Sequence, residues 1–570
     1  MAKWMISAKR GDFNEISSRF GIDKVTARLI RNRDVVGDGE IEKYLHASAA
    51  DFYSPYDLKD CEKAADLLLE KIDEGSRIRI IGDYDIDGIM STYILLTALK
   101  ELGADADYAI PERIRDGYGL NENLIREAFA AGVDTIVTCD NGISAVEQIR
   151  MAKEMGMSVI VTDHHNVPYE DTEEERRYIL PEADAVIDPK QPGCGYPYKE
   201  LCGAAVAWKL VCALYDMAGF EDEEKYAFLE FAAIATVGDI VDLKDENRLI
   251  VKEGLKRLHE TKHTGLCALI EKCGLEKNAV DPYHIGFVLG PCLNASGRLE
   301  TAEQALRLMC TEAREDALIL AARLRELNEM RKTMTEEGLE KAVSILEQSE
   351  LGKDRVLVVY LEDTHESLAG IIAGRLRERY NKPAFVLTDS EEGIKGSGRS
   401  VEQYSMYDEL VKAGDLLDKF GGHPMAAGLS MKKENAEKFR IRLNELCTLT
   451  DKDLEPVLHL DMQLPLAYLR EDLIEEFELL RPFGKGNEKP LFADREISAG
   501  NIRILGKNEN VLKMKLRDRY GAEIEGICFR NIDKLKKRAE EGTPLCIAYY
   551  PAVNSYKGRK TIQAVVTDCL

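Results

Sequence analysis

The stretch RIRIIGDYDIDG at residues 77–88 decides the fold, because in it an apolar run leads directly into three aspartates. A short run rich in β-branched residues is typical of a buried strand. Three more such runs lie at residues 135–139, 158–162 and 185–187, separated by helical patterns such as residues 90–102. Strands that alternate with helices predict βαβ units and a parallel sheet.

Four segments of this region run into acidic residues. The groups are DYDID at 83–87, DNG at 140–142, DHH at 163–165 and GD at 238–239. The last group follows the apolar segment at residues 232–237. In open parallel sheets the ligand site lies beyond the carboxyl ends of the strands, so we expect all four groups to meet on one rim.

Each group alone has a plainer interpretation, because Asp after a strand often caps a turn or helix. The first group also resembles an EF-hand loop, but Ile94 stands where that loop needs Glu. Four acidic groups with two imidazoles are hard to explain as caps, since clustered carboxylates are costly to bury without a cation. Carboxylates with one or two imidazoles favour Mn or Mg over Zn. Two ions about 3.5–4 Å apart would clamp the attacking and leaving oxygens of a phosphoryl displacement.

The bulk composition sets broad limits. A chain of 570 residues predicts three or four domains, and neither a secretory signal nor a membrane-spanning run is found. Thirteen cysteines form no Cys-x-x-Cys pair, so we expect a cytoplasmic enzyme with reduced thiols. The net charge of −25 argues against a nucleic-acid partner, yet residues 501–570 hold fourteen Lys and Arg against eight Asp and Glu. Composition therefore leaves a binding patch and a solvated face equally open.

Changes of pattern along the chain predict its domains. Residues 1–75 indicate a helical lead-in, and residues 76–300 the domain with the parallel sheet. Residues 301–349 are charged and almost free of Gly and Pro, which predicts a long connecting helix. A second α/β domain is expected over residues 350–450, and the β-type runs of residues 455–570 indicate a small barrel.

At its acidic groups the chain resembles the DHH phosphoesterase family, which is named for the motif at 163–165. The resemblance implies these metal ligands: Asp83, Asp85, Asp87, Asp140, His164 and Asp239. Asp85 is expected to bind one ion, Asp87 and His164 the other, and Asp140 and Asp239 both. The place of Asp83 and of the candidate catalytic residue His165 stays open among ligand, support of a ligand and phosphate contact.

Later motifs resemble the RecJ branch of this family. They are LGPCLNASGR at 289–298, GSGRS at 396–400, GGHPMAAG at 421–428 and RPFGKGN at 481–487. In the first, Cys292 stands where Arg is usual, so one basic contact is missing. The resemblance covers nearly the whole chain. It implies an α/β protein with a parallel-sheet DHH domain, a long connecting helix, a second α/β accessory domain and a C-terminal oligonucleotide-binding (OB) β-barrel.

The glycines of the two middle motifs would let backbone amides approach a phosphate, although each loop alone is more often a turn. With the resemblance, His423 becomes a second candidate catalytic residue. The implied substrate-binding residues are Arg113, Tyr118, Asn294, Arg298, Ser397 and Arg399. Arg113 would contact the terminal phosphate of a DNA strand, and Tyr118 would stack on a base.

The expected function is 5′-to-3′ exonuclease action on single-stranded DNA in repair and recombination, with two Mn or Mg ions. Polarity and DNA preference rest on the resemblance. It also suggests a single-strand-binding protein and a helicase as partners, and no membrane. One alternative is a DHH oligonucleotide or cyclic-dinucleotide phosphodiesterase, which has little use for the barrel. The other is a catalytically dead replication scaffold, which should lack acids in the first motifs.

Overall fold

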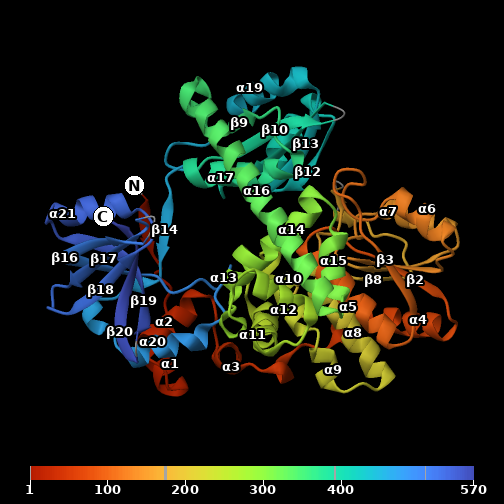
Figure 1. The fold of residues 1–570 in the computed structure, drawn as a ribbon, viewed down its shortest axis with the longest axis horizontal. Helices are drawn as coiled ribbons and strands as arrows, with labels where there is room; N and C mark the ends of the chain where they lie inside the picture. The colour runs from red at the N-terminus through yellow and green to blue at the C-terminus, as the bar shows by residue number, and fades with distance from the viewer. Residues whose placement is uncertain (1, 172–175, 391–392, 507–508, 557) are drawn as a thin grey trace. The chain divides into compact units, whose positions relative to one another are not determined.

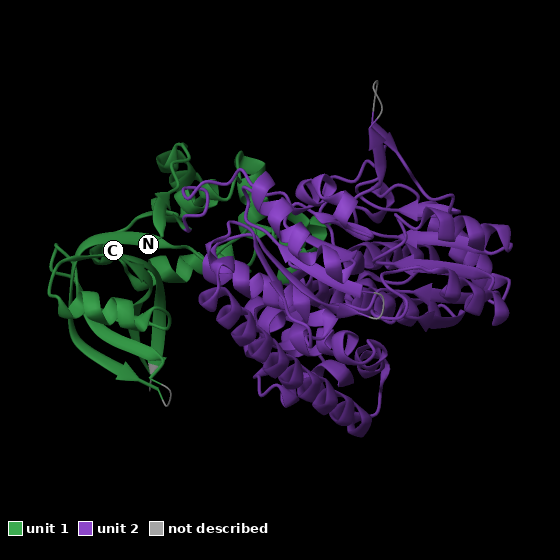
Figure 2. Ribbon diagram, turned by 90° about the horizontal axis from the view of Figure 1, so that it is seen from above, with its two compact units in different colours: residues 1–52, 242–252, 457–570 green, residues 53–241, 253–456 purple. Residues whose placement is uncertain are grey.

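The computed structural model describes the whole chain except residues 1, 172–175, 391–392, 507–508 and 557. The chain forms two compact units (Figure 2). Unit 1 contains residues 1–52, 242–252 and 457–570, and unit 2 contains residues 53–241 and 253–456. In the described part of the chain, no helix is both long and apolar enough to cross a membrane.

The expected parallel sheet is present in unit 2, in the order β3-β2-β4-β5-β8 (Figure 1). Its strands are β2 (Arg77–Ile81), β3 (Asp105–Ala109), β4 (Thr135–Cys139), β5 (Ser158–Thr162) and β8 (Ala185–Ile187). Helices α5 (Ile86–Glu101) and α8 (Gly203–Ala218) contact one face, and α6 (Glu122–Ala130) and α7 (Val146–Glu154) pack on the other. Because helices cover both faces, the central strands are rich in β-branched and apolar residues, which is why they can be found in the sequence.

The segment before Asp239 differs from the other three. Residues 232–237 lie in a helix, α10 (Leu229–Gly238), rather than in a strand, and Asp239 is the residue that ends it. Its residues 229–236 are all buried. An apolar run that is buried on every side has no periodicity that separates a strand from a helix.

The long helix expected between residues 301 and 349 is α16 (Arg314–Gln348), which is preceded by a separate helix, α15 (Glu303–Cys310). Two further helices pack on α16, namely α12 (Thr264–Lys272) and α14 (Gly290–Leu299). The accessory sheet has the order β12-β13-β11-β10-β9 and is flanked by α17 (Ala369–Tyr380). Its strands are β9 (Leu357–Tyr360), β10 (Ala384–Ser390), β11 (Gly393–Arg399), β12 (Lys419–His423) and β13 (Ala426–Met431).

Unit 1 contains the expected barrel. Its strands are β16 (Phe492–Leu505), β17 (Val511–Arg517), β18 (Glu523–Cys528), β19 (Leu545–Tyr556) and β20 (Arg559–Cys569). They pair in the order β16-β17-β18-β20-β19, and β19 pairs back to β16 to close the ring. A closed ring leaves these five strands without a free edge, as in an OB fold.

The N-terminal residues belong to the same unit as the barrel. Strand β1 (Lys3–Ile6) pairs in parallel with β14 (Val457–Leu460), and α2 (Lys24–Asn32) lies between α1 (Phe13–Phe20) and α3 (Asp38–His46). Leu29 of α2 is fully buried in one core with Phe492 and Tyr549 of the barrel. Apolar patterning predicts the buried face of a short helix but does not identify the element that covers it.

Candidate metal centre

The ends of β2, β4 and β5 bring the acidic groups together. These strands are neighbours and run in parallel, so Asp83, Asp140 and Asp163 follow them at one edge of the sheet. Asp239 reaches the same cluster from the end of α10. The ligand atoms fall within 4.8 Å of one another in three sets: Asp83–Asp85–Asp140, Asp87–His164–Asp239 and Asp140–Asp163–His164–His165. All six predicted metal ligands therefore lie in one cluster.

The surroundings of the Asp83 side chain indicate whether this cluster suits a cation. Its side chain is buried, and neither carboxylate oxygen has a hydrogen-bond partner among the described residues. Burial, and then the nearby charge of Asp85, raise its pKa well above the usual value. A buried carboxylate without a donor is costly unless a cation neutralises it. The donor set thus fits a divalent metal ion.

Helix N-termini hold the next two acids. One oxygen of Asp85 accepts hydrogen bonds from the N–H groups of Asp87 and Gly88 and so caps α5. Asp87 accepts two more, at 2.7 Å each, from the first residues of α8. Burial, followed by the charge of Asp85, still raises the pKa of Asp87 to about 7. The helices orient these carboxylates but do not offset the repulsion between them.

A small residue is required where α8 meets the cluster. A Cβ atom on Gly203 would lie 2.7 Å from the Cβ of Asp140, closer than real carbon atoms approach. The backbone is left-handed at Asp140 and at Ile240, the residue after Asp239, since both have φ 60°. A β-branched residue rarely adopts this conformation, and such strain gathers at functional sites.

The two histidines of the DHH motif differ in charge: one ring is neutral and the other is positively charged. Burial, and then the neighbouring His165, lower the pKa of His164 to about 4. Its Nε2 lies 3.0 Å from an oxygen of Asp140 and 3.6 Å from one of Asp87. His164 is therefore a neutral imidazole among carboxylates, which is the form that ligates metals.

His165, in contrast, is protonated on both ring nitrogens and is therefore positively charged. Burial acts against it, but the charge and hydrogen bond of Asp163 raise its pKa to about 9. His165 Nδ1 lies 2.7 Å from Asp163, which also accepts the N–H of Ile143. Nε2 then faces the hydroxyl of Tyr118 at 3.2 Å, and this hydroxyl donates to the main-chain oxygen of Asp140. Asp163 thus orients the motif, and the positively charged ring of His165 lies at the edge of the sheet where the acidic groups meet.

One further acidic residue lies beside the cluster and was not predicted from the sequence. Asp188 follows β8 and is fully buried, and one of its oxygens has no hydrogen-bond partner among the described residues. Burial, and then the charge of Asp163, raise its pKa to about 8. The signal was available, because Asp188 directly follows the predicted strand at residues 185–187.

Three predicted substrate arginines influence one another. Burial, and then the guanidinium of Arg113, lower the pKa of Arg298 to about 10, and Arg399 contributes in the same direction. Arg298 donates to the main-chain oxygen of Ser367, and a Cβ on Gly370 of α17 would lie 2.9 Å from Arg399. Partly buried cations beside a helix N-terminus form an environment suited to a phosphate.

The other predicted substrate residues are less closely linked. Asn294 accepts the N–H of Ile86, which follows Asp85, at 2.7 Å. Ser397 lies two residues before Arg399 on β11. His423 pairs with Ala426, which pairs with Arg399, so two strand spacings of about 4.8 Å each separate their backbones. His423 is exposed.

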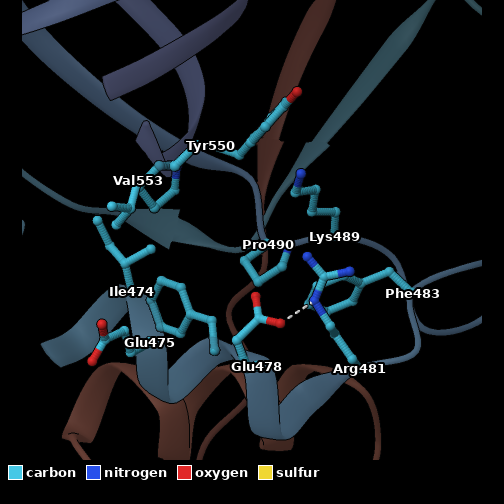
Figure 3. Close-up of a pocket in the computed structure, with 12 residues that line it drawn as sticks. Ile474, Glu475, Glu478, Arg481, Phe483, Lys489, Pro490, Tyr550 and Val553 are labelled. Atoms are coloured by element: carbon cyan, nitrogen blue, oxygen red, sulfur yellow. Dashed lines mark ion pairs between the residues drawn. The ribbon is translucent and has the colours of Figure 1, made fainter. Parts of the chain in front are cut away.

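The aromatic residues of the barrel divide into two groups. Tyr549 is buried in the core, whereas Tyr520, between β17 and β18, and Phe529, after β18, are more than half exposed. Tyr550 lines a hollow of about 240 Å³ in unit 1, together with Pro490 and the ion pair Glu478–Arg481 (Figure 3). That hollow lies on β19, and the β17–β18 face is the usual oligonucleotide face of an OB fold. The side chain of Tyr556 lies outside the described residues.

Three family models match the chain. The DHH family N-terminal domain matches residues 77–236, the DHHA1 domain residues 353–448, and the RecJ OB domain residues 460–568. The single-stranded-DNA-specific exonuclease RecJ of Bacillus subtilis is 36% identical over 99% of this chain and 70% of the relative. The RecJ of Escherichia coli is 33% identical over 95% of each chain.

Solved structures agree with these matches. RecJ of Thermus thermophilus in complex with Mn²⁺ has a TM-score of 0.83 and 27% identity, covering 100% of this chain and 79% of that one. The same protein in complex with Mg²⁺ has a TM-score of 0.76 and 26% identity, covering 100% and 78%.

Asp140→Asn should lower the affinity for Mn²⁺ by more than the roughly 10–100-fold that loss of a supporting residue costs, because it removes a ligand. Without metal the variant should unfold at the same or a higher temperature than the wild type, since one buried charge is gone. Calorimetric titration and thermal unfolding measure both effects. Asp105→Asn, at the other end of the same sheet, is the control, and an unchanged affinity of Asp140→Asn would refute the assignment.

Proposed function

This chain belongs to the RecJ family, and on that premise we propose that it degrades single-stranded DNA from the 5′ end by metal-dependent hydrolysis of phosphodiester bonds. The observation that carries the proposal is the cluster of the six predicted ligands, one of which is the buried, unpartnered carboxylate of Asp83. A scaffold without catalysis has no need to keep so costly a cluster. The OB barrel favours a polynucleotide over a dinucleotide substrate.

Two divalent ions, Mn or Mg, are proposed to be held by the predicted ligands, where they would polarise the phosphate and activate water. The chain's own residues orient and charge the site. Asp163 holds the His165 ring so that its Nε2–H faces the rim beside Tyr118. As an imidazolium, His165 can donate to a phosphoryl oxygen while charge develops on it. His164 stays neutral for the metal.

Recognition of a 5′-terminal phosphate is the finer part of the proposal. The cluster of Arg113, Arg298 and Arg399, together with the N-terminal end of α17, provides donors and positive charge for a terminal phosphate. Ser397 and Asn294 would assist, and the role of His423 stays a prediction. A single-strand-binding protein and a helicase also stay predictions from the resemblance.

Strands of DNA labelled at one end test the function itself. With Mn²⁺, the protein should shorten a single strand but not a blunt duplex, and a chelator should stop the reaction. Asp85→Ala and His164→Ala should abolish hydrolysis without unfolding the protein, because each removes a metal ligand. Cleavage that persists in chelator, or full activity in His164→Ala, would exclude the proposed chemistry.

Arg399→Ala should reduce the preference for a 5′-phosphorylated strand over a 5′-hydroxyl strand. A charge-assisted hydrogen bond is worth about 1.5–3 kcal/mol, so KM for the phosphorylated strand should rise roughly tenfold or more. Arg375→Ala, on an exposed position of α17, is the matched control. If a block at the 5′ end leaves digestion unchanged while a 3′ block stops it, the proposed polarity is wrong.

The exposed aromatic residues of the barrel are proposed to stack on bases of the strand. Tyr520→Ala combined with Phe529→Ala should weaken binding of long strands by about 1–3 kcal/mol per stacked base and leave kcat on very short strands unchanged. Point variants are preferred to removal of residues 455–570, which would expose the part of the core formed by Leu29. Phe129→Ala, an exposed aromatic on α6, is the control, and equal affinities would withdraw the assignment.

A further inference from the structure

Two cysteines lie in contact, and one of them belongs to the helix that carries Asn294 and Arg298. Cys292 lies in α14, and Cys273 follows the last residue of α12. Their sulfur atoms are 3.8 Å apart. Cys292 is buried and also receives a hydrogen bond from Asn328 of α16, whereas Cys273 is partly exposed. Each sulfur can therefore reach the other, but solvent reaches mainly Cys273.

The surroundings make Cys273 the more reactive of the two. The hydrogen bond from Cys292, and then the charges of Arg325 and Lys332, lower its pKa, although burial acts in the opposite direction. Either sulfur can donate in the contact between the two thiols, and the effect of Cys273, followed by burial, raises the pKa of Cys292. A partly exposed cysteine near basic residues, with a second thiol 3.8 Å away, is the arrangement typical of cysteines that oxidise reversibly.

We propose that Cys273 and Cys292 are a site of reversible oxidation, at which hydrogen peroxide converts the two thiols into a disulfide. The Cys273 thiolate attacks one oxygen of the peroxide, which leaves a sulfenic acid on Cys273 and hydroxide that takes up a proton. The Cys292 thiol then attacks that sulfur, the S–S bond forms, and water leaves. The two thiols lose two electrons in all, and the peroxide gains them. A cellular dithiol reverses the step by thiol–disulfide exchange.

The disulfide would act on the metal centre through α14. An S–S bond of about 2.05 Å requires the two sulfurs to approach by about 1.8 Å. Helix α14 has little room to absorb this movement, because a Cβ on Gly297 would lie 2.4 Å from the main-chain oxygen of Tyr84, and Asn294 holds the N–H of Ile86. Both contacts flank Asp85. A misplacement of about 1 Å can cost on the order of 100-fold in rate, so we expect a loss of at least about tenfold on oxidation.

The test uses the full-length protein, treated with hydrogen peroxide in metal-free buffer and then with catalase. Peptide mapping by mass spectrometry without reductant should find the Cys273 and Cys292 peptides joined and lighter by two hydrogen atoms. Hydrolysis of single-stranded DNA with Mn²⁺ should fall at least about tenfold. It should recover after dithiothreitol. Cys267→Ser, which alters another cysteine of α12, should behave like the wild type, while Cys273→Ser and Cys273→Ala should keep their activity through the treatment.

The two readouts separate this inference from the proposed function, on which its activity arm rests. If the untreated protein does not hydrolyse single-stranded DNA, the proposed function fails, and the mass measurement still decides the disulfide. If no joined peptide forms in the wild type, the oxidation site is overturned. If the disulfide forms without loss of activity, or if both Cys273 variants are inactivated like the wild type, the coupling through α14 is overturned.

Discussion

Burial of several carboxylates at one rim is the constraint on which the rest of this structure depends. Asp83, Asp87 and Asp140 are buried side by side, and their raised pKa values show that the fold alone does not stabilise their charges. Helix N-termini orient Asp85 and Asp87, Gly203 gives room for Asp140, and the backbone at Asp140 is left-handed. Much local structure is thus arranged around carboxylates whose charges a bound cation would stabilise.

Within that site, Asp163 separates the roles of the two histidines. It accepts hydrogen bonds from the backbone and from His165, so its oxygens are engaged by the protein. Its charge and hydrogen bond, acting against burial, raise the pKa of His165 to about 9, whereas burial and the neighbouring His165 lower the pKa of His164 to about 4. Asp163 thus orients the motif through its hydrogen bonds, which is how a supporting residue behind a metal site acts.

Unit 1 shows how segments far apart in the chain form one core. The N-terminal helices bury Leu29 and Ile30 against the barrel, and Arg248 donates to main-chain oxygens of Tyr44 and Leu479. Two of the barrel's basic residues are engaged in ion pairs, since Lys513 and Lys515 pair with Glu525 and Glu523 across the strands. The exposed aromatic side chains therefore matter for strand binding beside net charge.

The sequence alone determined the parallel sheet, the six clustered acids and histidines, the long helix and the barrel. It did so because strands covered on both faces are rich in β-branched and apolar residues, and the segments after their carboxyl ends carry the acidic residues. Only the tertiary structure decided that residues 232–237 form a helix, that Asp188 adjoins the site and that Cys273 meets Cys292. The local sequence pattern indicates how a segment is buried, whereas these features depend on which distant segment of the chain packs against it.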